Sequence, residues 1–246
     1  MENYWNPKLK LSTVPPPPPI TRGMATAIAF QKLTLLPDDA NIKVFADLYD
    51  KLYVEAGDLA IYGELYIPAP LSEEFGVIDL YHAFRMAYQA YDEPWMPLWK
   101  QYNLAAFKLP PVGDEPEVRA ICTGSEDNAY NELGLYFTDQ NVDKQRKNGG
   151  KKIQQFNDST SAMEMIFFDP MSYIIVNAIR IELGQPPLDK PTTTRFVGID
   201  EKTTDGDVLV PRADWRDGGL GFGGSRVGDR WGRGGVRFSV GRKVGT

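Results

Sequence analysis

Residues 217–246 read DGGLGFGGSRVGDRWGRGGVRFSVGRKVGT and hold eleven of the chain's twenty-three glycines. Five arginines are interleaved with these glycines, at Arg226, Arg230, Arg233, Arg237 and Arg242. Glycine contributes no side chain to a core and loses the most backbone entropy when it becomes ordered. This stretch is therefore predicted not to fold unaided, and to acquire its shape by lying against another polypeptide.

The rest of the chain has the composition of a folded protein. Hydrophobic residues make up 42% and aromatic residues 12% of its 246 residues, which is enough for a core. Residues 211–246 carry eight basic and three acidic side chains, so the net charge of −6 divides into +5 there and −11 before it. An acidic body with a basic arm suits self-association in which each arm lies on a neighbouring body.

Three regions follow from this composition. Residues 1–20 are predicted to form a Pro-rich N-terminal arm, because the five prolines at 15–19 favour the stiff polyproline II conformation. Residues 21–186 are predicted to form a mainly helical body, and residues 187–246 an extended Gly/Arg-rich C-terminal arm. The predicted fold class is a mainly α body with a minor β component (α+β), flanked by long extended N- and C-terminal arms.

Helical periodicity dominates the predicted body. After Asp39, apolar residues recur at helical spacing, at Ile42, Phe45, Leu48, Tyr49 and Leu52. A second helix is expected to begin at Ser72, which can serve as its N-cap. Residues 58–67 are compatible with either a strand or a short buried helix.

The strongest helix signal is the dipeptide Asp169-Pro170, which combines an N-cap residue with proline at the first helical position. Gly184 is predicted to end this helix. A short helix is expected just before it, over residues 159–167. Residues 143–152 are instead predicted to form a basic loop, because lysines and Arg146 flank a central Gly-Gly pair.

Within the C-terminal arm, the turn sequence Asp205-Gly206 favours a β-hairpin between the apolar segments on either side of it. Residues 235–241 alternate apolar and polar, so that Val236, Phe238 and Val240 share one face of a strand. Such a strand can add to the sheet edge of a neighbouring subunit.

Residues expected to contact partners lie in both arms. Tyr4 and Trp5 precede the proline rod and are suited to anchoring in a partner's pocket. The complete predicted set of partner-binding residues is Tyr4, Trp5, Arg226, Arg230, Trp231, Arg233, Val236, Arg237, Phe238, Val240 and Arg242.

No catalytic, cofactor-binding or metal-binding residues are predicted. His82 and Cys122 are the chain's single histidine and single cysteine, so a classical zinc site cannot be completed. Adjacent acids, as in Glu73-Glu74, point in different directions on a helix and are expected to be solvated. The glycine run 218–224 lacks the strand and helix that would make it a phosphate-binding loop.

These observations predict a non-enzymatic structural subunit of a large oligomeric assembly, with arms exchanged between neighbours. The expected setting is a virus or phage particle, in which the protein is capsid-associated or connects head to tail. Its expected partners are copies of itself and other subunits of that assembly. The expected location is the virion, or the host cytoplasm during assembly, because neither a signal peptide nor a transmembrane segment is apparent.

Two other functions remain open at this level. Glycine and arginine with interspersed aromatics, here Phe222, Trp231 and Phe238, also suit a tail that binds single-stranded nucleic acid. A carboxylate-dependent hydrolase is the second alternative, and it requires two acids that converge on one cleft.

Overall fold

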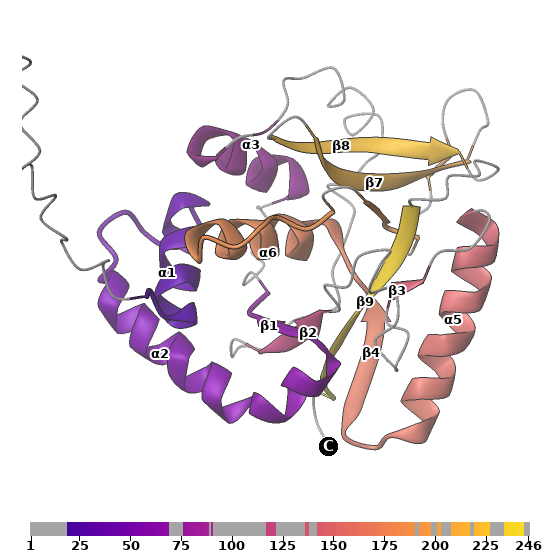
Figure 1. The fold of residues 1–246 in the computed structure, drawn as a ribbon, viewed down its shortest axis with the longest axis horizontal. Coiled ribbons are helices and arrows are strands. Elements are labelled where there is room, and N and C mark those ends of the chain that lie inside the picture. The colour runs from indigo at the N-terminus through magenta and orange to yellow at the C-terminus, as the bar shows by residue number, and fades with distance from the viewer. Residues whose placement is uncertain are drawn as a thin grey trace, which may run out of the picture.

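A computed structural model gives the fold of the chain (Figure 1). It describes residues 19–68, 76–88, 90, 117–121, 136–137, 142–189, 192–197, 201–202, 208–216, 219–226 and 234–243. Helices account for about half of the described residues and strands, which form a mixed sheet, for about a quarter. The fold is therefore α/β, and the prediction of a mainly α body with a minor β component is wrong.

Along the described chain, helices predominate at the start and strands at the end. The helices are α1 (Arg22–Lys32), α2 (Ile42–Glu55), the 3-10 helix η1 (Gly57–Tyr62), α3 (Val77–Ala87), α5 (Val142–Ser159) and α6 (Pro170–Glu182). The strands are β1 (Glu64–Tyr66), β2 (Arg119–Ile121), β3 (Tyr136–Phe137), β4 (Met163–Phe167), β5 (Thr193–Arg195), β6 (Glu201–Lys202), β7 (Val208–Arg216), β8 (Gly219–Arg226) and β9 (Gly234–Arg242).

Strand β9 joins the two halves of the sheet. It pairs antiparallel with β2, β3 and β4, and parallel with β5, which in turn pairs with β7. Val240 of β9 has a register partner on both sides, Ala120 in β2 and Met165 in β4. Because this strand has neighbours on both edges, it is an interior strand of the sheet and offers no free edge there to another molecule.

The helices cover this sheet from two sides. Figure 1 shows α1, α2 and α6 gathered on one side of β9, and α5 on the other. Helix α6 is buried along most of its length, and Asp169 caps its first turn by accepting a hydrogen bond from Ser172 N at 2.8 Å. Proline stands at its first position and Gly184 follows its end with φ 68°, so this predicted helix is confirmed.

The prediction of an extended C-terminal arm is also wrong. Residues of β5 and of β7 to β9 pack into the sheet of their own chain, and β9 is buried from Gly234 to Gly241. Between its glycines, residues 236–240 of β9 supply the side chains that the arm as a whole lacks. The rest of the chain therefore provides the contacts that a neighbour was expected to provide. The predicted N-terminal arm, residues 1–20, lies almost wholly outside the described residues.

Three local predictions are corrected or resolved. The expected basic loop at 143–152 is part of helix α5, and the expected short helix at 159–167 is largely strand β4. Residues 58–67, which were compatible with a helix or a strand, contain one of each: the 3-10 helix η1 and, one residue later, strand β1. Helix α2 begins at Ile42 with Asn41 as its N-cap, and α3 begins at Val77 after Gly76. Within the described chain, no helix combines the length and the apolar character needed to span a membrane.

Candidate functional site

Both faces of β9 are buried, although its sequence alternates. Val236, Phe238 and Val240 lie on one face, and Arg237 and Ser239 lie on the other, each no more than 1% exposed. The apolar face was predicted correctly, but the polar side chains do not point into solvent. Instead they take part in two hydrogen-bonded clusters of polar side chains inside the protein.

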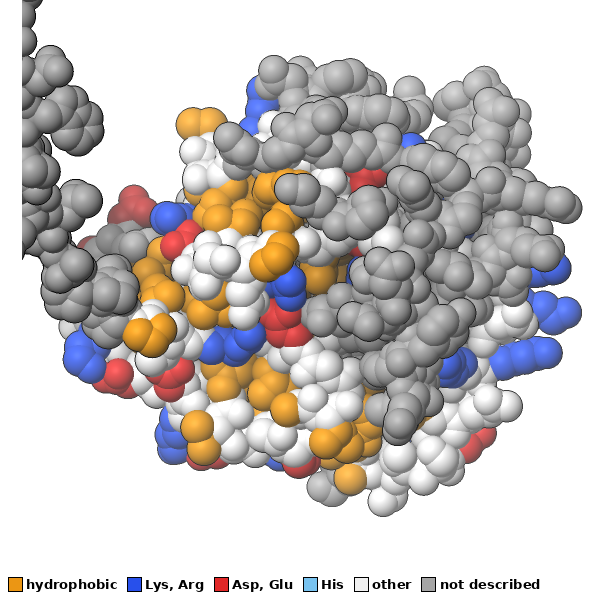
Figure 2. Space-filling view, viewed as in Figure 1, with side chains coloured by type: hydrophobic (Ala, Val, Ile, Leu, Met, Phe, Trp, Pro, Cys, Tyr) orange, Lys and Arg blue, Asp and Glu red, His pale blue; other side chains and the backbone are white. Residues whose placement is uncertain are grey.

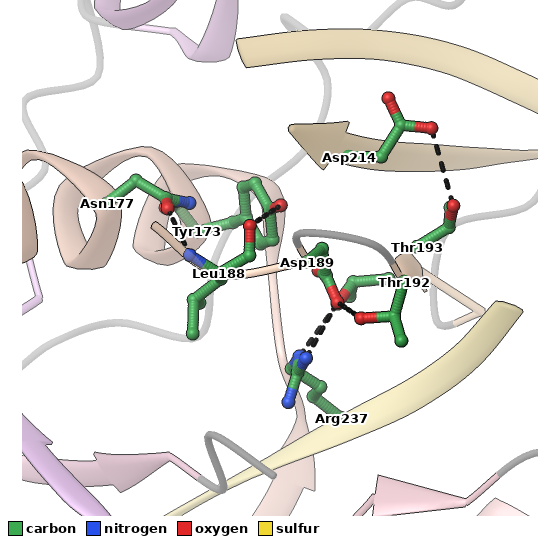
Figure 3. Close-up of polar contacts among 9 residues, drawn as sticks. Tyr173, Asn177, Leu188, Asp189, Thr192, Thr193, Asp214 and Arg237 are labelled. Carbon is green, nitrogen blue, oxygen red and sulfur yellow. Dashed lines mark hydrogen bonds and ion pairs between the residues drawn. The ribbon is translucent and has the colours of Figure 1, made fainter. Parts of the chain in front are cut away.

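The first cluster is built around an ion pair between Arg237 and Asp189 (Figure 3). Arg237 Nη2 lies 2.7 Å from Asp189 Oδ1, and the two side chains are 1% and 0% exposed. Thr192 donates to Asp189 Oδ1 at 2.5 Å, and Thr194 donates to Oδ2 at 2.6 Å. Thr194 also accepts from Arg237 Nε at 2.8 Å, so one hydroxyl links both charges.

A short loop holds this aspartate in place against α6. Asp189 has a φ of 60°, a left-handed conformation that aspartate adopts more readily than most residues. The loop is fixed by Asn177 of α6, whose Oδ1 accepts from Leu188 N at 2.8 Å. Burial raises the pKa of Tyr173, which is also on α6, well above its ordinary value, and the nearby Asp189 carboxylate raises it further.

The second cluster lies further along β9, around Arg119. Its Nε donates to Ser239 Oγ at 2.9 Å, and Ser239 also bonds to Tyr66 Oη at 2.7 Å. Its Nη1 lies 3.0 Å from Glu164 and 3.6 Å from Glu117. Burial raises the pKa of Glu117 and raises that of Tyr66 to about 12.

These clusters are better suited to cross-linking the fold than to catalysis. In the first, the charged side chains are excluded from solvent, so a substrate has no access to them. In the second, two carboxylates converge as a hydrolase requires, but both contact the same nitrogen of Arg119. The arginine thus occupies the position between the acids that a scissile bond needs. Within the described residues, no group of three or more His, Cys, Asp or Glu could hold a metal ion.

The predicted partner-binding residues are separated by the fold. Val236, Arg237, Phe238 and Val240 are used internally, as described above. Arg242 is exposed at the end of β9, where its Nη2 lies 2.8 Å from Asp58 Oδ1 and donates to the carbonyl of Glu55 at 3.0 Å. Arg226 is the last residue of β8. The predicted contacts Tyr4, Trp5, Arg230, Trp231 and Arg233 lie outside the described residues.

Sequence reasoning missed an apolar surface on α2. We call this surface the outer α2 face and define it as Val44, Leu48 and Val54, which are 61%, 42% and 80% exposed. At 100° per residue they fall within about 120° of the helix circumference. The buried side of α2 is instead formed by Ala46, Tyr49 and Tyr53. Leu48 belongs to the apolar repeat that predicts this helix, and only the packing of α1 against α2 shows that it points outward.

Two ion pairs lie on the same side of α2, among the residues of the outer α2 face. Lys43 lies 2.8 Å from Asp47, and Lys51 lies 3.7 Å from Glu55. Figure 2 shows hydrophobic side chains at the surface over α2, among these charged groups. Single exposed apolar residues are ordinary, but several on one face of one helix mark a candidate contact surface.

No known protein family, no characterised protein and no solved structure matches this chain. The arrangement of its own side chains therefore carries the functional argument.

Proposed function

We propose that this protein is a non-enzymatic structural subunit that assembles with copies of itself, the outer α2 face of one copy receiving the N-terminal segment of another. The observation that carries the proposal is the set of exposed apolar side chains Val44, Leu48 and Val54 on a helix whose other side is already packed. Covering them would remove apolar surface from water, which favours association.

The position of residue 19 supports the N-terminal segment as the occupant. The chain enters α1 beside α2, because Asp50 of α2 accepts hydrogen bonds from Thr21 Oγ1 and Gly23 N, each at 2.7 Å. Eighteen residues precede this point, and they include the aromatic pair Tyr4 and Trp5. These residues therefore begin close to the outer α2 face of their own copy.

The prolines support exchange between copies. The five prolines at 15–19 favour polyproline II, in which each residue advances about 3.1 Å, so a segment of this kind would span about 15 Å as a stiff rod. Such a rod would not turn back on the helix beside which it starts, and it would instead carry Tyr4 and Trp5 toward a neighbouring copy. The expectation of a virus or phage particle depended on two exchanged arms. Since the C-terminal one folds into its own sheet, the proposal concerns assembly and not the kind of particle.

The proposal predicts that removing either half of the contact gives monomers. In light scattering coupled to size exclusion, the full chain should be oligomeric at micromolar concentration. Both Val44→Ala/Leu48→Ala and Tyr4→Ala/Trp5→Ala should weaken association by at least about tenfold, since each apolar side chain contributes on the order of 1.5 kcal/mol. Alanine favours helix, so the first variant should keep its fold.

Met86→Ala is the matched control, because Met86 is 88% exposed on α3, away from the outer α2 face. It should leave the oligomer intact. A monomeric full chain, or an oligomer that survives both double substitutions, would contradict the proposal. A monomer in which the N-terminal segment covers its own α2 would also be a monomeric full chain, and it would contradict the proposal.

A further inference from the structure

We propose that helix α5 binds the phosphodiester backbone of nucleic acid through an exposed lysine face. We define this α5 lysine face as Lys144, Lys147 and Lys151, all of which are exposed. The inference is independent of the assembly proposed above, since α5 lies on the opposite side of β9 from α2 (Figure 1).

The spacing of the lysines places them on one side of the helix. At 100° per residue they fall within about 60° of its circumference, and at 1.5 Å per residue they span about 10 Å along its axis. A DNA duplex carries one negative charge per 1.7 Å of its axis, so about six phosphate charges lie along the same length. Three lysines can therefore contact phosphates simultaneously without any change in the helix.

The opposite side of α5 is anchored to the sheet, which fixes the direction of the lysines. Gln145 is fully buried; its Nε2 donates to Gly234 O at 2.9 Å and its Oε1 accepts from Arg195 at 3.0 Å. Two residues from the helix end, Asn157 bonds to both N and O of Met165 in β4. The lysine face is thus presented by a helix held at both ends, and little ordering is required on binding.

The charge of α5 contrasts with that of the chain. The helix holds five basic and two acidic side chains, a net charge of +3, in a protein of net charge −6. Within the described chain, Lys147 and Lys151 form no ion pair, unlike Lys43 and Lys51 on α2. Figure 2 shows Lys and Arg side chains projecting from the edge of the molecule formed by α5. A polyanion would be repelled by most of the acidic chain and attracted here, so it should bind in a defined place.

The other residues of this face favour nucleic acid over a protein or a membrane. Gln154 and Gln155 are exposed beyond the lysines, and Gln154 bonds to Asp158 at 2.8 Å. Protein interfaces are depleted in lysine and need apolar anchors at their centre, and membrane-surface helices need an apolar face that inserts. Exposed lysines and amides without apolar neighbours instead resemble the polar, positively charged interfaces made with nucleic acid.

The test is fluorescence anisotropy of the full chain with a labelled 20-base-pair DNA duplex of mixed sequence, from 50 to 200 mM salt. Three phosphate contacts predict a slope of about −2.7 in log K against log salt, which is about a 40-fold loss of affinity over this range. Lys147→Gln/Lys151→Gln should remove about two thirds of this slope. Lys43→Gln/Lys51→Gln removes the same charge from α2 and should leave the slope unchanged.

Each alternative outcome counts against the inference. No binding of the duplex at 50 mM salt would overturn it, and so would an equal loss in both lysine variants, because binding would then follow net charge alone. A polyglutamate peptide or anionic lipid vesicles that bind as tightly as the duplex, with the same dependence on Lys147 and Lys151, would assign the face to another partner. Circular dichroism melting of both variants establishes that each remains folded.

Discussion

Asp169 and Asp189 are both buried aspartates beside α6, but only one of them has a charged partner in direct contact. Asp189 forms an ion pair with Arg237 and accepts from two threonines. Asp169 caps α6 through Ser172, and burial raises the pKa of its carboxyl. The same chemical change, carboxylate to amide, should therefore have opposite effects on stability at these two positions.

We expect Asp169→Asn to be more stable than the parent at pH 7. A folded-state pKa above the unfolded value of about 3.9 means that the folded protein binds the proton more tightly, so its stability falls as pH rises through that pKa. Asparagine keeps the cap but carries no charge. The free energy of unfolding should therefore exceed that of the parent by about 1.4 kcal/mol for each unit by which folding raises the pKa of Asp169. The gain should disappear by about pH 3 in chemical denaturation, where the parent carboxyl is protonated.

Asp189→Asn is the comparison and should destabilise the protein by about 3–5 kcal/mol, because the charge of Arg237 is left buried without its partner. The amide NH2 also replaces an oxygen that accepts from Thr194. Denaturation midpoints at pH 7 that move in the same direction for both variants would contradict this account.

At the scale of elements, two helical glycines differ in the space around them. A Cβ at Gly23 in α1 would lie 2.4 Å from the carbonyl oxygen of Ala46 in α2, so these helices cross where no side chain fits. A Cβ at Gly150 in α5 would meet nothing within 4 Å. Glycine is thus required by packing in α1 and merely lowers helix stability in α5.

Alanine substitution should separate these roles. Gly150→Ala should stabilise the protein by about 0.5–1 kcal/mol, since the helix loses a flexible residue and gains no clash. Gly23→Ala should destabilise it by about 1–3 kcal/mol, because the backbone of α2 has to move. Thermal melting measures both, and a stabilising Gly23→Ala would show that α1 and α2 separate without cost.

The elements also differ in how far their sequence predicted them. Helix α6 carried local signals at both ends, and Asp169, Pro170 and Gly184 act as expected. The sequence of helix α5 predicted a loop because it contains Gly149-Gly150, yet the helix runs through these glycines and tertiary contacts at Gln145 and Asn157 hold it in place. Local propensity is overridden where contacts with distant residues are this specific.

For the whole molecule, the position of β9 decides what a truncation does. A chain that ends at residue 233 loses the register partners of β2, β3, β4 and β5 together. Burial of Val236, Phe238 and Val240 alone contributes on the order of 5–9 kcal/mol, which is comparable to the total stability of a typical domain.

We therefore expect the chain ending at 233 to lack a cooperative thermal transition and a near-UV circular dichroism signal. Removal of residues 1–18 is the control and should leave both intact, because those residues precede the described fold. A folded, cooperative protein without β9 would restore the idea of a separable C-terminal arm.

Clusters that join distant parts of the chain could not be predicted from the sequence. Tyr66 and Ser239 are 173 residues apart and share a hydrogen bond, while Asp189 meets Arg237 across 48 residues. Arginine among glycines is typical of flexible binding tails, and nothing local indicates that Arg237 is neutralised inside the sheet. The outer α2 face could likewise not be predicted. Apolar periodicity identifies the buried side of a helix only when the opposite side is polar, and α2 carries apolar residues on both sides.

The late position of β9 along the chain also bears on biosynthesis. Translation runs from the N-terminus, so β2, β4 and β5 leave the ribosome before the strand with which they pair. Until residue 242 emerges, these strands present unpaired edges to other nascent chains. Because these pairings join distant parts of the chain, we expect this step of folding to be slow.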